Sequence, residues 1–597
     1  MKKIMTGNEA VALGAYEGGV RYASAYPGTP STEILQNLSM YKEVVSEWAP
    51  NEKVALETVI GASIAGGRSL AAMKHVGVNV AADPLFTFAY QGVNAGSVLI
   101  TADEPGMHSS QNEQDNRNYA TFAKIPMLEP ANSQESKDMM IDAFKLSEEF
   151  DSIVLFRMTT RVCHSKGIVQ TGERIEKEFI PYEKNFNKYV AVPSIARGLR
   201  HKVEERTNRL KEYTETSKWN YEVDNKTKIG IITSGICFEY AQEAFGDTVS
   251  YLKLGFTNPL PQNLIADFCD KYETIYVIEE NDPYIENFAK QLGKSIHGKD
   301  ILPYTGEMTP DVIKKFILGN EIEGVETNTD LFVPRPPTFC TGCPHRGFFY
   351  ELGKKRKKIV VAGDIGCYSL AVGEPYNMMD WLVCMGASFS TAHGAQRVFD
   401  MNENENRRLV SIMGDSTFFH TGINSLINTV YNNGNTINVI LDNRITGMTG
   451  QQDNPGSGYK LQKETTAIMD IENIVKAIGV KHVKRVNPNI LNDVKDTINW
   501  ALELEETSVI ITDWPCKLKK SYNEEDFGKY EKMWKTKDIV LEDKCTGCKA
   551  CLRSGCSSLI FDPETKKTRI NSNTCVGCDV CLQICPFDAI VKDENYG

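Results

Sequence analysis

Apolar and polar residues alternate along the first 190 residues in short blocks, each with the length of a single helix or strand. A helical pattern ends at Gly18-Gly19, and a strand is expected over residues 20–25. A turn at 27–30 follows, after which Ser31 is expected to cap another short helix. An alanine-rich helical pattern covers 52–65. Alternating helices and strands of this kind predict an α/β fold.

The same alternation returns further along the chain, after a highly charged stretch. Residues 194–217 are charged and helix-like, which is typical of a solvated connecting helix. A second α/β unit follows, and a proline-containing linker is expected over 325–337. The strands predicted in this unit cover residues 228–233, 249–254 and 274–279.

A third block, from about residue 338 to 526, contains a strand–helix–strand pattern with polar residues at both strand ends. The strand 408–413 leads into Gly414-Asp415-Ser416, and the strand 436–441 leads into Asp442-Asn443. Ligands of open α/β sheets bind at the carboxyl ends of strands. The side chains of Asp415 and Asn443, with the backbone carbonyl near Ile445, therefore predict a Mg²⁺ site that carries a diphosphate.

Composition narrows the class of protein. The chain has 597 residues, which predicts several domains, and a net charge of −12, which argues against nucleic acid as a partner. The start of the chain lacks the apolar core of a signal peptide, and no apolar run has the length of a membrane span. We expect a cytoplasmic protein with no membrane partner.

Cysteines are concentrated at the C-terminus, where they follow a metal-binding spacing. Eight of the 16 cysteines lie beyond residue 544. Three cysteines at x2 steps occur twice, and the second set ends in Cys-Pro, as in ferredoxins with two [4Fe–4S] clusters. Crosswise ligation assigns one cluster to Cys545, Cys548, Cys551 and Cys585, and the other to Cys575, Cys578, Cys581 and Cys556.

Two features qualify this assignment. A pair of zinc sites is the alternative, because zinc also binds C-x2-C pairs, but the triple x2 spacing favours iron–sulfur clusters. The first set departs from the usual spacing, with x4 before Cys556 and Ser557 in the place of proline. We expect an unusual potential at this irregular motif.

The Asp415 and Asn443 pattern resembles the thiamine-diphosphate motif GDG-x(about 30)-N, with Ser416 in the place of the last glycine. Thiamine chemistry also needs a glutamate that faces the aminopyrimidine ring. Glu52 and Glu57, both in the alanine-rich helix, are the candidates. For either residue, an ordinary acid near a helix N-terminus is the structural alternative.

Five motifs together resemble the 2-oxoacid:ferredoxin oxidoreductases, and within them the branch that acts on aryl 2-oxoacids. The motifs are Gly7-Asn8-Glu9-Ala10, Tyr26-Pro27-Gly28-Thr29-Pro30-Ser31-Thr32-Glu33-Ile34, Cys340-Thr341-Gly342-Cys343-Pro344-His345-Arg346-Gly347, Gly363-Asp364-Ile365-Gly366-Cys367 and Gly414-Asp415-Ser416-Thr417-Phe418-Phe419. With the ferredoxin-like tail, the resemblance covers nearly the whole chain.

The resemblance implies a multidomain α/β protein in a fixed domain order. A pyrimidine-binding thiamine domain (1–190) is joined by a charged linker helix (191–224) to a transketolase-C-terminal-like domain (225–320). A diphosphate-binding thiamine domain (330–526) and an α+β ferredoxin-like module with two [4Fe–4S] clusters (536–597) follow.

The resemblance also implies roles for individual residues. Glu52 matches the activating glutamate, Thr29 a substrate-side threonine, and Arg117 is a candidate for the 2-oxoacid carboxylate, although a surface arginine is the structural alternative. His345, Gly414, Ser416 and Ile445 belong to the matched cofactor-binding segments. Cys340, Cys343, Cys367 and Cys516 match a third cluster near the thiamine, although Tyr368 stands where serine is common. The remaining Cys163, Cys237, Cys269 and Cys384 are expected to be packing residues.

The activity that the resemblance implies is oxidative decarboxylation of an aryl 2-oxoacid, such as indole-3-pyruvate, phenylpyruvate or 4-hydroxyphenylpyruvate. Coenzyme A would accept the acyl group, and ferredoxin the electrons. A small beta subunit would complete the enzyme as a heterodimer or α2β2 assembly. Pyruvate or 2-oxoglutarate oxidation, a non-oxidative thiamine decarboxylase and a non-catalytic electron-transfer or scaffold subunit are the alternatives.

Overall fold

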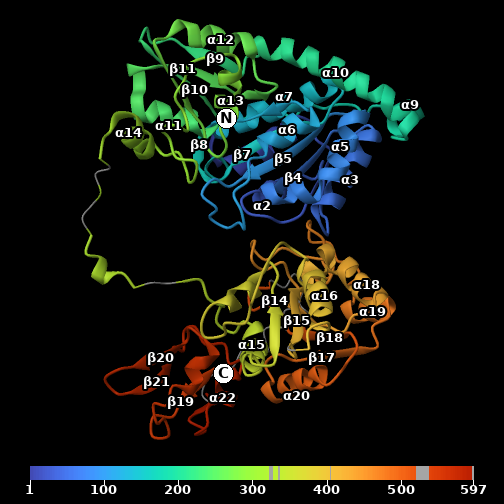
Figure 1. The fold of residues 1–597 in the computed structure, drawn as a ribbon, viewed down its shortest axis with the longest axis vertical. Coiled ribbons are helices and arrows are strands. Elements are labelled where there is room, and N and C mark those ends of the chain that lie inside the picture. Colours follow the sequence, from blue (N-terminus) through green and yellow to red (C-terminus); the bar gives the residue numbers. More distant parts are fainter. Residues whose placement is uncertain (322–323, 325–326, 334–335, 404, 520–536, 594–597) are drawn as a thin grey trace. The chain divides into compact units, whose positions relative to one another are not determined.

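The computed structural model describes residues 1–321, 324, 327–333, 336–403, 405–519 and 537–593 (Figure 1). Two compact units, Met1–Thr327 and Asn328–Gly597, divide the chain, and each is described by itself. The division falls inside the predicted linker at 325–337. Part of that linker and the predicted domain limits at 526 and 536 lie outside the described residues.

The first unit contains a seven-stranded sheet with the order β12-β6-β7-β5-β4-β2-β3. Its strands are β2 (Tyr22–Ala25), β3 (Val45–Trp48), β4 (Ser69–Lys74), β5 (Ser97–Asp103), β6 (Met127–Leu128), β7 (Val154–Thr159) and β12 (Phe256–Asn258). All neighbours are parallel except β12 and β6. Because β12 comes from beyond the charged helix, the second α/β segment contributes a strand to the first sheet.

Two helices on this sheet begin at well-capped residues. Helix α1 (Gly7–Glu17) has a capping box, in which the backbone N–H of Glu9 donates to Thr6 Oγ1 and that of Thr6 to the Glu9 carboxylate. Asn51 caps α3 (Glu52–Ile64) by accepting from the backbone N–H of Val54 at 2.9 Å. Helices α1 and α3 confirm the two helices predicted from the sequence. Ser31 precedes α2 (Thr32–Leu38), but its hydroxyl donates to the Gly28 carbonyl and does not cap the helix.

A four-stranded sheet completes the first unit, with the order β13-β10-β11-β9. The strands are β9 (Asn220–Val223), β10 (Ile229–Ser234), β11 (Ser250–Leu254) and β13 (Thr274–Ile278). The charged helix α10 (Pro193–Glu215) precedes it, as predicted. This helix is more than a solvated connection, because Leu199, Val203, Arg206 and Leu210 form a buried face at helical spacing.

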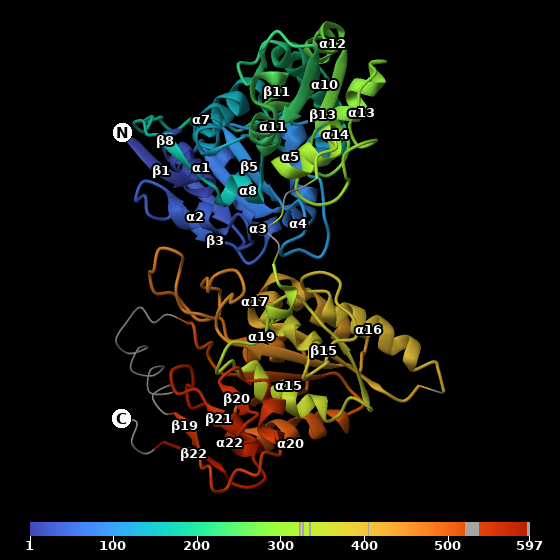
Figure 2. The same cartoon turned by 90° about the vertical axis from the view of Figure 1, so that its left-hand side faces the viewer.

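The second unit is built on a five-stranded parallel sheet, with the order β14-β15-β16-β18-β17 (Figures 1 and 2). The strands are β14 (Ile359–Ala362), β15 (Arg408–Gly414), β16 (Ile437–Asp442), β17 (His482–Val486) and β18 (Ser508–Asp513). Helices α15 (His345–Gly353), α16 (Ser388–Phe399), α18 (Ile423–Tyr431), α19 (Ile471–Ile478) and α20 (Leu491–Leu502) accompany it. The predicted strands at 408–413 and 436–441 are confirmed.

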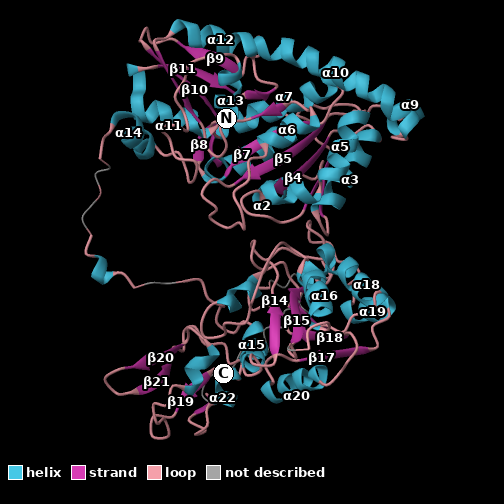
Figure 3. Ribbon diagram, in the orientation of Figure 1, coloured by secondary structure: helices cyan, strands magenta, loops and turns pink. Residues whose placement is uncertain are grey.

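A small C-terminal module packs within the same unit (Figure 3). It has two antiparallel strand pairs, β19 (Asp538–Val540) with β22 (Ile590–Lys592) and β20 (Leu559–Asp562) with β21 (Lys567–Ile570). Two short helices, η5 (Ala550–Ser554) and α22 (Val580–Ile584), lie between them in sequence order. In the part of the chain that the structure describes, none of the helices combines the length and apolarity of a membrane span.

Buried charges connect the two sheets of the first unit. Arg157 of β7 pairs with Asp103 at 2.6 Å and with Glu129 at 2.8 Å. Arg117 pairs with Asp115 and, across to the end of β13, with Glu279, both at 2.6 Å. A buried ion pair is strongly destabilising when one partner is removed. The two α/β segments of this unit are therefore joined through a charged contact as well as through β12.

Glu280, next to this network, is buried without an ion pair within the described chain. Its carboxylate accepts a hydrogen bond from the backbone N–H of Met308 at 3.2 Å. Burial raises the pKa of Glu280 to about 7. Because the raised pKa means that the folded state binds this proton more tightly, Glu280 lowers the free energy of unfolding as the pH rises from about 4.5 to about 7.

We predict that Glu280→Gln stabilises the protein at pH 8 but changes little at pH 5. Glutamine keeps an acceptor for the Met308 N–H and is never charged. The expected gain at pH 8 is roughly 3 kcal/mol, the free-energy equivalent of raising the pKa of this carboxyl from about 4.5 to about 7. Urea unfolding of the wild type and the variant at both pH values measures it, and equal effects at pH 5 and pH 8 would contradict the prediction.

Candidate functional site

The second unit brings the predicted diphosphate-site residues together at the carboxyl edge of its sheet. Strands β15 and β16 are parallel neighbours, so Asp415 and Asn443, the residues that follow them, lie side by side. The backbone N–H of Ile445 donates to Asp415 Oδ2 at 3.0 Å and to Asn443 Oδ1 at 3.2 Å. Ser416 and Thr446 exchange a hydroxyl hydrogen bond of 2.7 Å.

The electrostatics of this edge suit a bound cation. Asp415 is only 2% exposed, and burial, with the nearby Asp442 carboxylate, raises its pKa above the usual value. A buried carboxylate of this kind is stabilised by a positive charge, and oxygen donors are the ligands that Mg²⁺ prefers. Asn454, which sequence reasoning missed, donates to Asp415 Oδ2 at 2.9 Å. Only the folded loop places it there, since no spacing rule connects it to Asp415.

Two further residues shape this edge. Tyr368 packs against Gly414, where an added Cβ would lie 2.9 Å from the tyrosine ring. Its hydroxyl donates to the carbonyl of Ile365 at 2.7 Å. Asp364 is completely buried and accepts from the backbone N–H groups of Gly386 and Ser388 at 2.7 and 2.8 Å. Asp364 belongs to one of the motifs without a role predicted from the sequence, and in the structure it ties two loops of the site together.

The four cysteines expected to form a third cluster gather beside Asp415. Cys516 donates its backbone N–H to the carbonyl of Asn443 at 3.0 Å. The Cys367 sulfur would lie 3.3 Å from a Cβ added at Gly447. Burial raises the pKa of the Cys367 thiol to about 12, and the charges of Cys516, Cys340 and Asp415 add to that rise. Cys343 belongs to the same group, because it lies within the electrostatic reach of Cys516 and Cys367. Deprotonation of these thiols would need a positive charge nearby, which a bound metal cluster would supply.

His345 lies beside this cysteine group. It is 2% exposed, and burial lowers its pKa to about 4, so the ring is neutral. Its Nδ1 atom has no hydrogen-bond partner within the described chain. The ring stands edge-on to Tyr368, with the centroids 6.1 Å apart. Its assignment to the cofactor stays a prediction.

The C-terminal module gathers its cysteines crosswise, in the sets that the spacing predicts. Cys545, Cys548, Cys551 and Cys585 line one small cavity. Around the other position, the thiol of Cys581 is influenced by the charges of Cys578, Cys556 and Cys575. The assignment of each set to a [4Fe–4S] cluster stays a prediction. Within the described residues, no three His, Cys, Asp or Glu side chains are grouped to hold one metal ion.

The remaining cysteines divide into two kinds. Cys163, Cys237 and Cys269 are buried, as expected of packing residues. Cys384 is exposed, so the expectation that it packs in a core is wrong.

The first unit distinguishes between the two candidate glutamates. Glu52 opens helix α3 and is 7% exposed. It lies against Gly77 of α4 (His75–Val80), where a Cβ on residue 77 would come within 2.8 Å of Glu52 Oε1. Glu57 points to solvent and pairs with Lys53. Burial and close packing favour Glu52 as the functional carboxylate.

Thr29 lies in a turn at the carboxyl end of β2, on the same edge of its sheet as Glu52. Asn8 holds the turn by donating to the carbonyl of Pro30 at 2.7 Å. Gly28 packs on Lys74, with 3.1 Å between an added Cβ and Lys74 Cβ. Lys74, at the end of β4, was not singled out in the sequence; it meets the turn through its Cβ, while its ammonium group donates to the carbonyl of Ser109 at 2.9 Å and pairs with Glu104.

Arg117 does not occupy the exposed, substrate-facing position that the sequence suggested. It is 1% exposed, and its Nη2 donates to Asp115 and to the carbonyls of Glu280 and Asp282. Its Nη1 donates to Glu279. A guanidinium has five N–H donors, and those of Arg117 are committed to the protein itself. The geometry gives Arg117 a structural role and does not support carboxylate binding.

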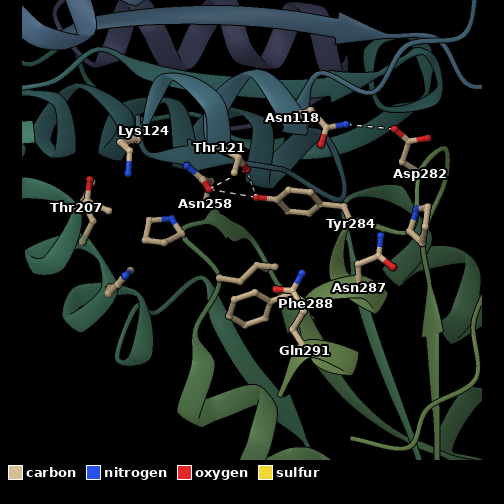
Figure 4. A pocket seen from close by; sticks show the side chains of 15 residues that line it. Asn118, Thr121, Lys124, Thr207, Asn258, Asp282, Tyr284, Asn287, Phe288 and Gln291 are labelled. Atoms are coloured by element: carbon tan, nitrogen blue, oxygen red, sulfur yellow. Dashed lines mark hydrogen bonds between the residues drawn. The ribbon is translucent and has the colours of Figure 1, made fainter. Parts of the chain in front are cut away.

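The first unit also contains a cavity of about 530 Å³ between α6 (Arg117–Ala123), α10 and α13 (Tyr284–Gln291) (Figure 4). In the close-up, the Tyr284 hydroxyl points to Thr121 and Asn258, at 3.0 and 3.2 Å. The polar groups that line the cavity thus largely pair with one another. None of the described residues that line it is a predicted site residue, so the cavity is separate from the candidate site.

Comparisons with known proteins agree with this geometry. The family profile described as "Pyruvate flavodoxin/ferredoxin oxidoreductase, thiamine diP-bdg" matches residues 13–227. The profile "Thiamine pyrophosphate enzyme, C-terminal TPP binding domain" matches 364–512, the sheet that carries Asp415 and Asn443. A "4Fe-4S dicluster domain" matches 537–586, the C-terminal module. The predicted α/β thiamine domains and ferredoxin-like module are thereby confirmed.

Curated relatives match the chain over almost its full length. The "Indolepyruvate oxidoreductase subunit IorA" of Methanothermobacter marburgensis is 40% identical, over 98% of this chain and 96% of its own. The IorA subunits of Pyrococcus abyssi and Archaeoglobus fulgidus are each 39% identical, over 99% of this chain and 96% and 97% of theirs. The chain therefore belongs to the family of the IorA subunits of indolepyruvate oxidoreductase, thiamine-diphosphate-dependent 2-oxoacid oxidoreductases with iron–sulfur clusters.

Proposed function

We propose that the chain is the catalytic subunit of an enzyme that oxidatively decarboxylates aryl 2-oxoacids with coenzyme A. The products are aryl-acetyl-CoA, CO2 and reduced ferredoxin. The observation that carries this proposal is the position of Asp415 and Asn443 beside the cysteines 340, 343, 367 and 516 in one unit. A diphosphate site next to a cluster site suits a decarboxylation whose electrons leave one at a time. Indole-3-pyruvate is the first candidate substrate because the relatives are named for it, with phenylpyruvate and 4-hydroxyphenylpyruvate next.

The chain's own residues divide the work. Asp415, Asn443 and the carbonyl near Ile445 would hold Mg²⁺ and, through it, the diphosphate of the cofactor. Bound thiamine diphosphate supplies the nucleophilic carbon and the electron sink for decarboxylation. Glu52 would hold a proton at the aminopyrimidine N1′ atom. Thr29 would contact the 2-oxoacid from the substrate side.

Electron transfer completes the proposal. Three [4Fe–4S] clusters would take the electrons to a soluble ferredoxin, one at Cys340, Cys343, Cys367 and Cys516 and two in the C-terminal module. A small beta subunit would complete the enzyme, as a heterodimer or α2β2 assembly. A non-oxidative thiamine decarboxylase and a non-catalytic electron carrier are the alternatives, and they would give different results in the measurements that follow.

The direct test is an anaerobic assay of the full chain with its small partner subunit, reconstituted with iron, sulfide, Mg²⁺ and thiamine diphosphate. We expect viologen or ferredoxin reduction that requires both an aryl 2-oxoacid and coenzyme A. Pyruvate and 2-oxoglutarate complete the substrate panel, and we expect them to be poorer substrates. Carbon dioxide release without viologen reduction would indicate a non-oxidative decarboxylase and would contradict the proposal.

We predict that Glu52→Gln lowers kcat by about 10²–10⁴-fold, the usual contribution of a positioned acid or base. Glu57→Gln is the matched control, because this residue is in the same helix but exposed, and it should keep wild-type kcat. The iron content of both variants should equal that of the wild type. Equal losses in the two variants would reject the assignment of Glu52.

We predict that Asp415→Ala weakens thiamine diphosphate binding by about 100-fold, since a metal ligand and its hydrogen bonds are lost together. Calorimetric titration with the cofactor and Mg²⁺ measures the effect. The iron–sulfur absorption should persist, and this separates cofactor loss from unfolding. Unchanged cofactor affinity would show that the diphosphate binds elsewhere and would favour an electron carrier.

A further inference from the structure

Arg346 is a buried cation between two cysteine-bearing loops of the second unit. It stands in the first turn of α15, three residues after Cys343, and is 1% exposed. Its guanidinium donates to the backbone carbonyls of Phe339 and Cys340 in the first loop. It also donates to the carbonyl of Ser554 in the second, at 3.1 Å. One side chain therefore links the loop of Cys340 and Cys343 to the loop that leads to Cys556.

Other contacts hold these loops together. Thr341 and Ser557 exchange a hydroxyl hydrogen bond of 3.1 Å. The hydroxyl of Tyr376 donates to the Ser554 carbonyl, and an added Cβ at Gly555 would lie 3.1 Å from that hydroxyl. Gly555 has φ of +65°, a conformation that favours glycine. The residues around Cys556 thus form the surface through which the C-terminal module contacts the domain of the five-stranded sheet.

The partners of Arg346 leave its charge uncompensated. Arg117 and Arg157, the comparable buried arginines of the first unit, each pair with at least two carboxylates. The partners of Arg346 are carbonyls and the hydroxyl of Tyr376, and within the described chain it forms no ion pair with Asp or Glu. Burying an unpaired charge costs several kcal/mol. The polypeptide thus supplies hydrogen bonds but no carboxylate to this guanidinium, and a negative group bound nearby would lower the cost of burying it.

The thiols on both sides are the groups that can become negative. Arg346 is close enough to Cys343 to oppose the rise in the pKa of that thiol caused by burial. Tyr376, which contacts Arg346, lies within the electrostatic reach of both Cys343 and Cys556. A cluster held by four thiolates carries net negative charge, and it becomes more negative on reduction.

We propose that Arg346 is the shared counter-charge of two iron–sulfur clusters and raises the reduction potential of each. One cluster is bound by Cys340, Cys343, Cys367 and Cys516, and the other by Cys575, Cys578, Cys581 and Cys556. This inference rests on the proposed function, because the cluster at Cys340, Cys343, Cys367 and Cys516 is part of that proposal. A fixed positive charge stabilises the state that has gained an electron, and it acts most strongly where water is excluded. Arg346 is a positioning residue in this account, since it acts through the clusters.

The set at Cys545, Cys548, Cys551 and Cys585 provides an internal reference. Its cavity is lined by residues of the C-terminal module, none of which bonds to Arg346. Its potential should therefore respond little to changes at residue 346, while the other two potentials shift together.

Two variants separate charge from hydrogen bonding. Arg346→Gln keeps donors for the loop carbonyls but removes the charge, and Arg346→Lys keeps the charge but has fewer donors. Tyr376→Phe is the matched control, because it removes a bond to Ser554 without changing charge. The full chain with its partner subunit is reconstituted anaerobically, its iron is counted, and each cluster is titrated potentiometrically by electron paramagnetic resonance.

We expect the potentials of the two flanking clusters to shift to more negative values in Arg346→Gln. In Arg346→Lys and Tyr376→Phe they should stay near those of the wild type, as should the reference cluster in all variants. Unchanged potentials in Arg346→Gln, or equal shifts in the glutamine and lysine variants, would overturn the proposal. Loss of both clusters in both variants would also overturn it, because the hydrogen bonds and not the charge would then be the function of Arg346.

The iron content of the wild type distinguishes a failure of the Arg346 inference from a failure of the proposed function. Three clusters correspond to about 12 iron atoms per chain and two clusters to about 8. A wild-type count of about 8 would remove the third cluster from the proposed function. The shift of the Cys556 cluster in Arg346→Gln would still decide the role of Arg346.

Discussion

A charge can be buried in a protein only where an opposite charge or a set of hydrogen bonds replaces the water it loses, and both units of this chain depend on that constraint. In the first unit, Arg157 meets Asp103 within the first sheet, while Arg117 pairs with Glu279 at the end of the second, so a buried charge joins the two α/β segments. In the second unit, the protein leaves the balance incomplete. Asp415 and Arg346 are buried charges of opposite sign, and in the proposed function a bound cation would compensate the first and thiolate-bound iron the second.

The sequence predicted the features that depend on local pattern. Periodicity located β15, β16 and α3, and the residues after these strands, Asp415 and Asn443, proved to be neighbours. Cysteine spacing predicted the two crosswise sets of the C-terminal module. These features follow from the local pattern of each strand or cysteine motif, combined with the known way in which a βαβ unit or a two-cluster ferredoxin brings such segments together.

Features that depend on distant contacts were not predictable in this way. Arg117 suited a substrate carboxylate by its chemistry, but its partner Glu279 lies 162 residues away and is visible only in the fold. Cys384 looked like any unassigned cysteine, yet its loop exposes it. The buried face of α10 was masked by the charges on its other faces. In each case the chemistry of the residue was clear from the sequence, but its tertiary surroundings were not.

The irregular C-terminal motif shows how a local departure acquires meaning. The spacing before Cys556 adds one residue to the usual pattern, and Gly555 uses its left-handed conformation to approach Tyr376. Ser557, in the place of proline, bonds to Thr341 beside Cys340. The departure from the common ferredoxin pattern therefore coincides with the contact between the two cysteine-bearing loops.

The location of iron in the reconstituted chain tests the central claim most directly. Anomalous scattering at the iron absorption edge, from crystals grown without oxygen, places each cluster independently of any assay. The account predicts three iron positions, one of them at Cys340, Cys343, Cys367 and Cys516, with Arg346 between it and the position held by Cys556. Iron in the C-terminal module alone, with the four cysteines beside Asp415 empty, would contradict it.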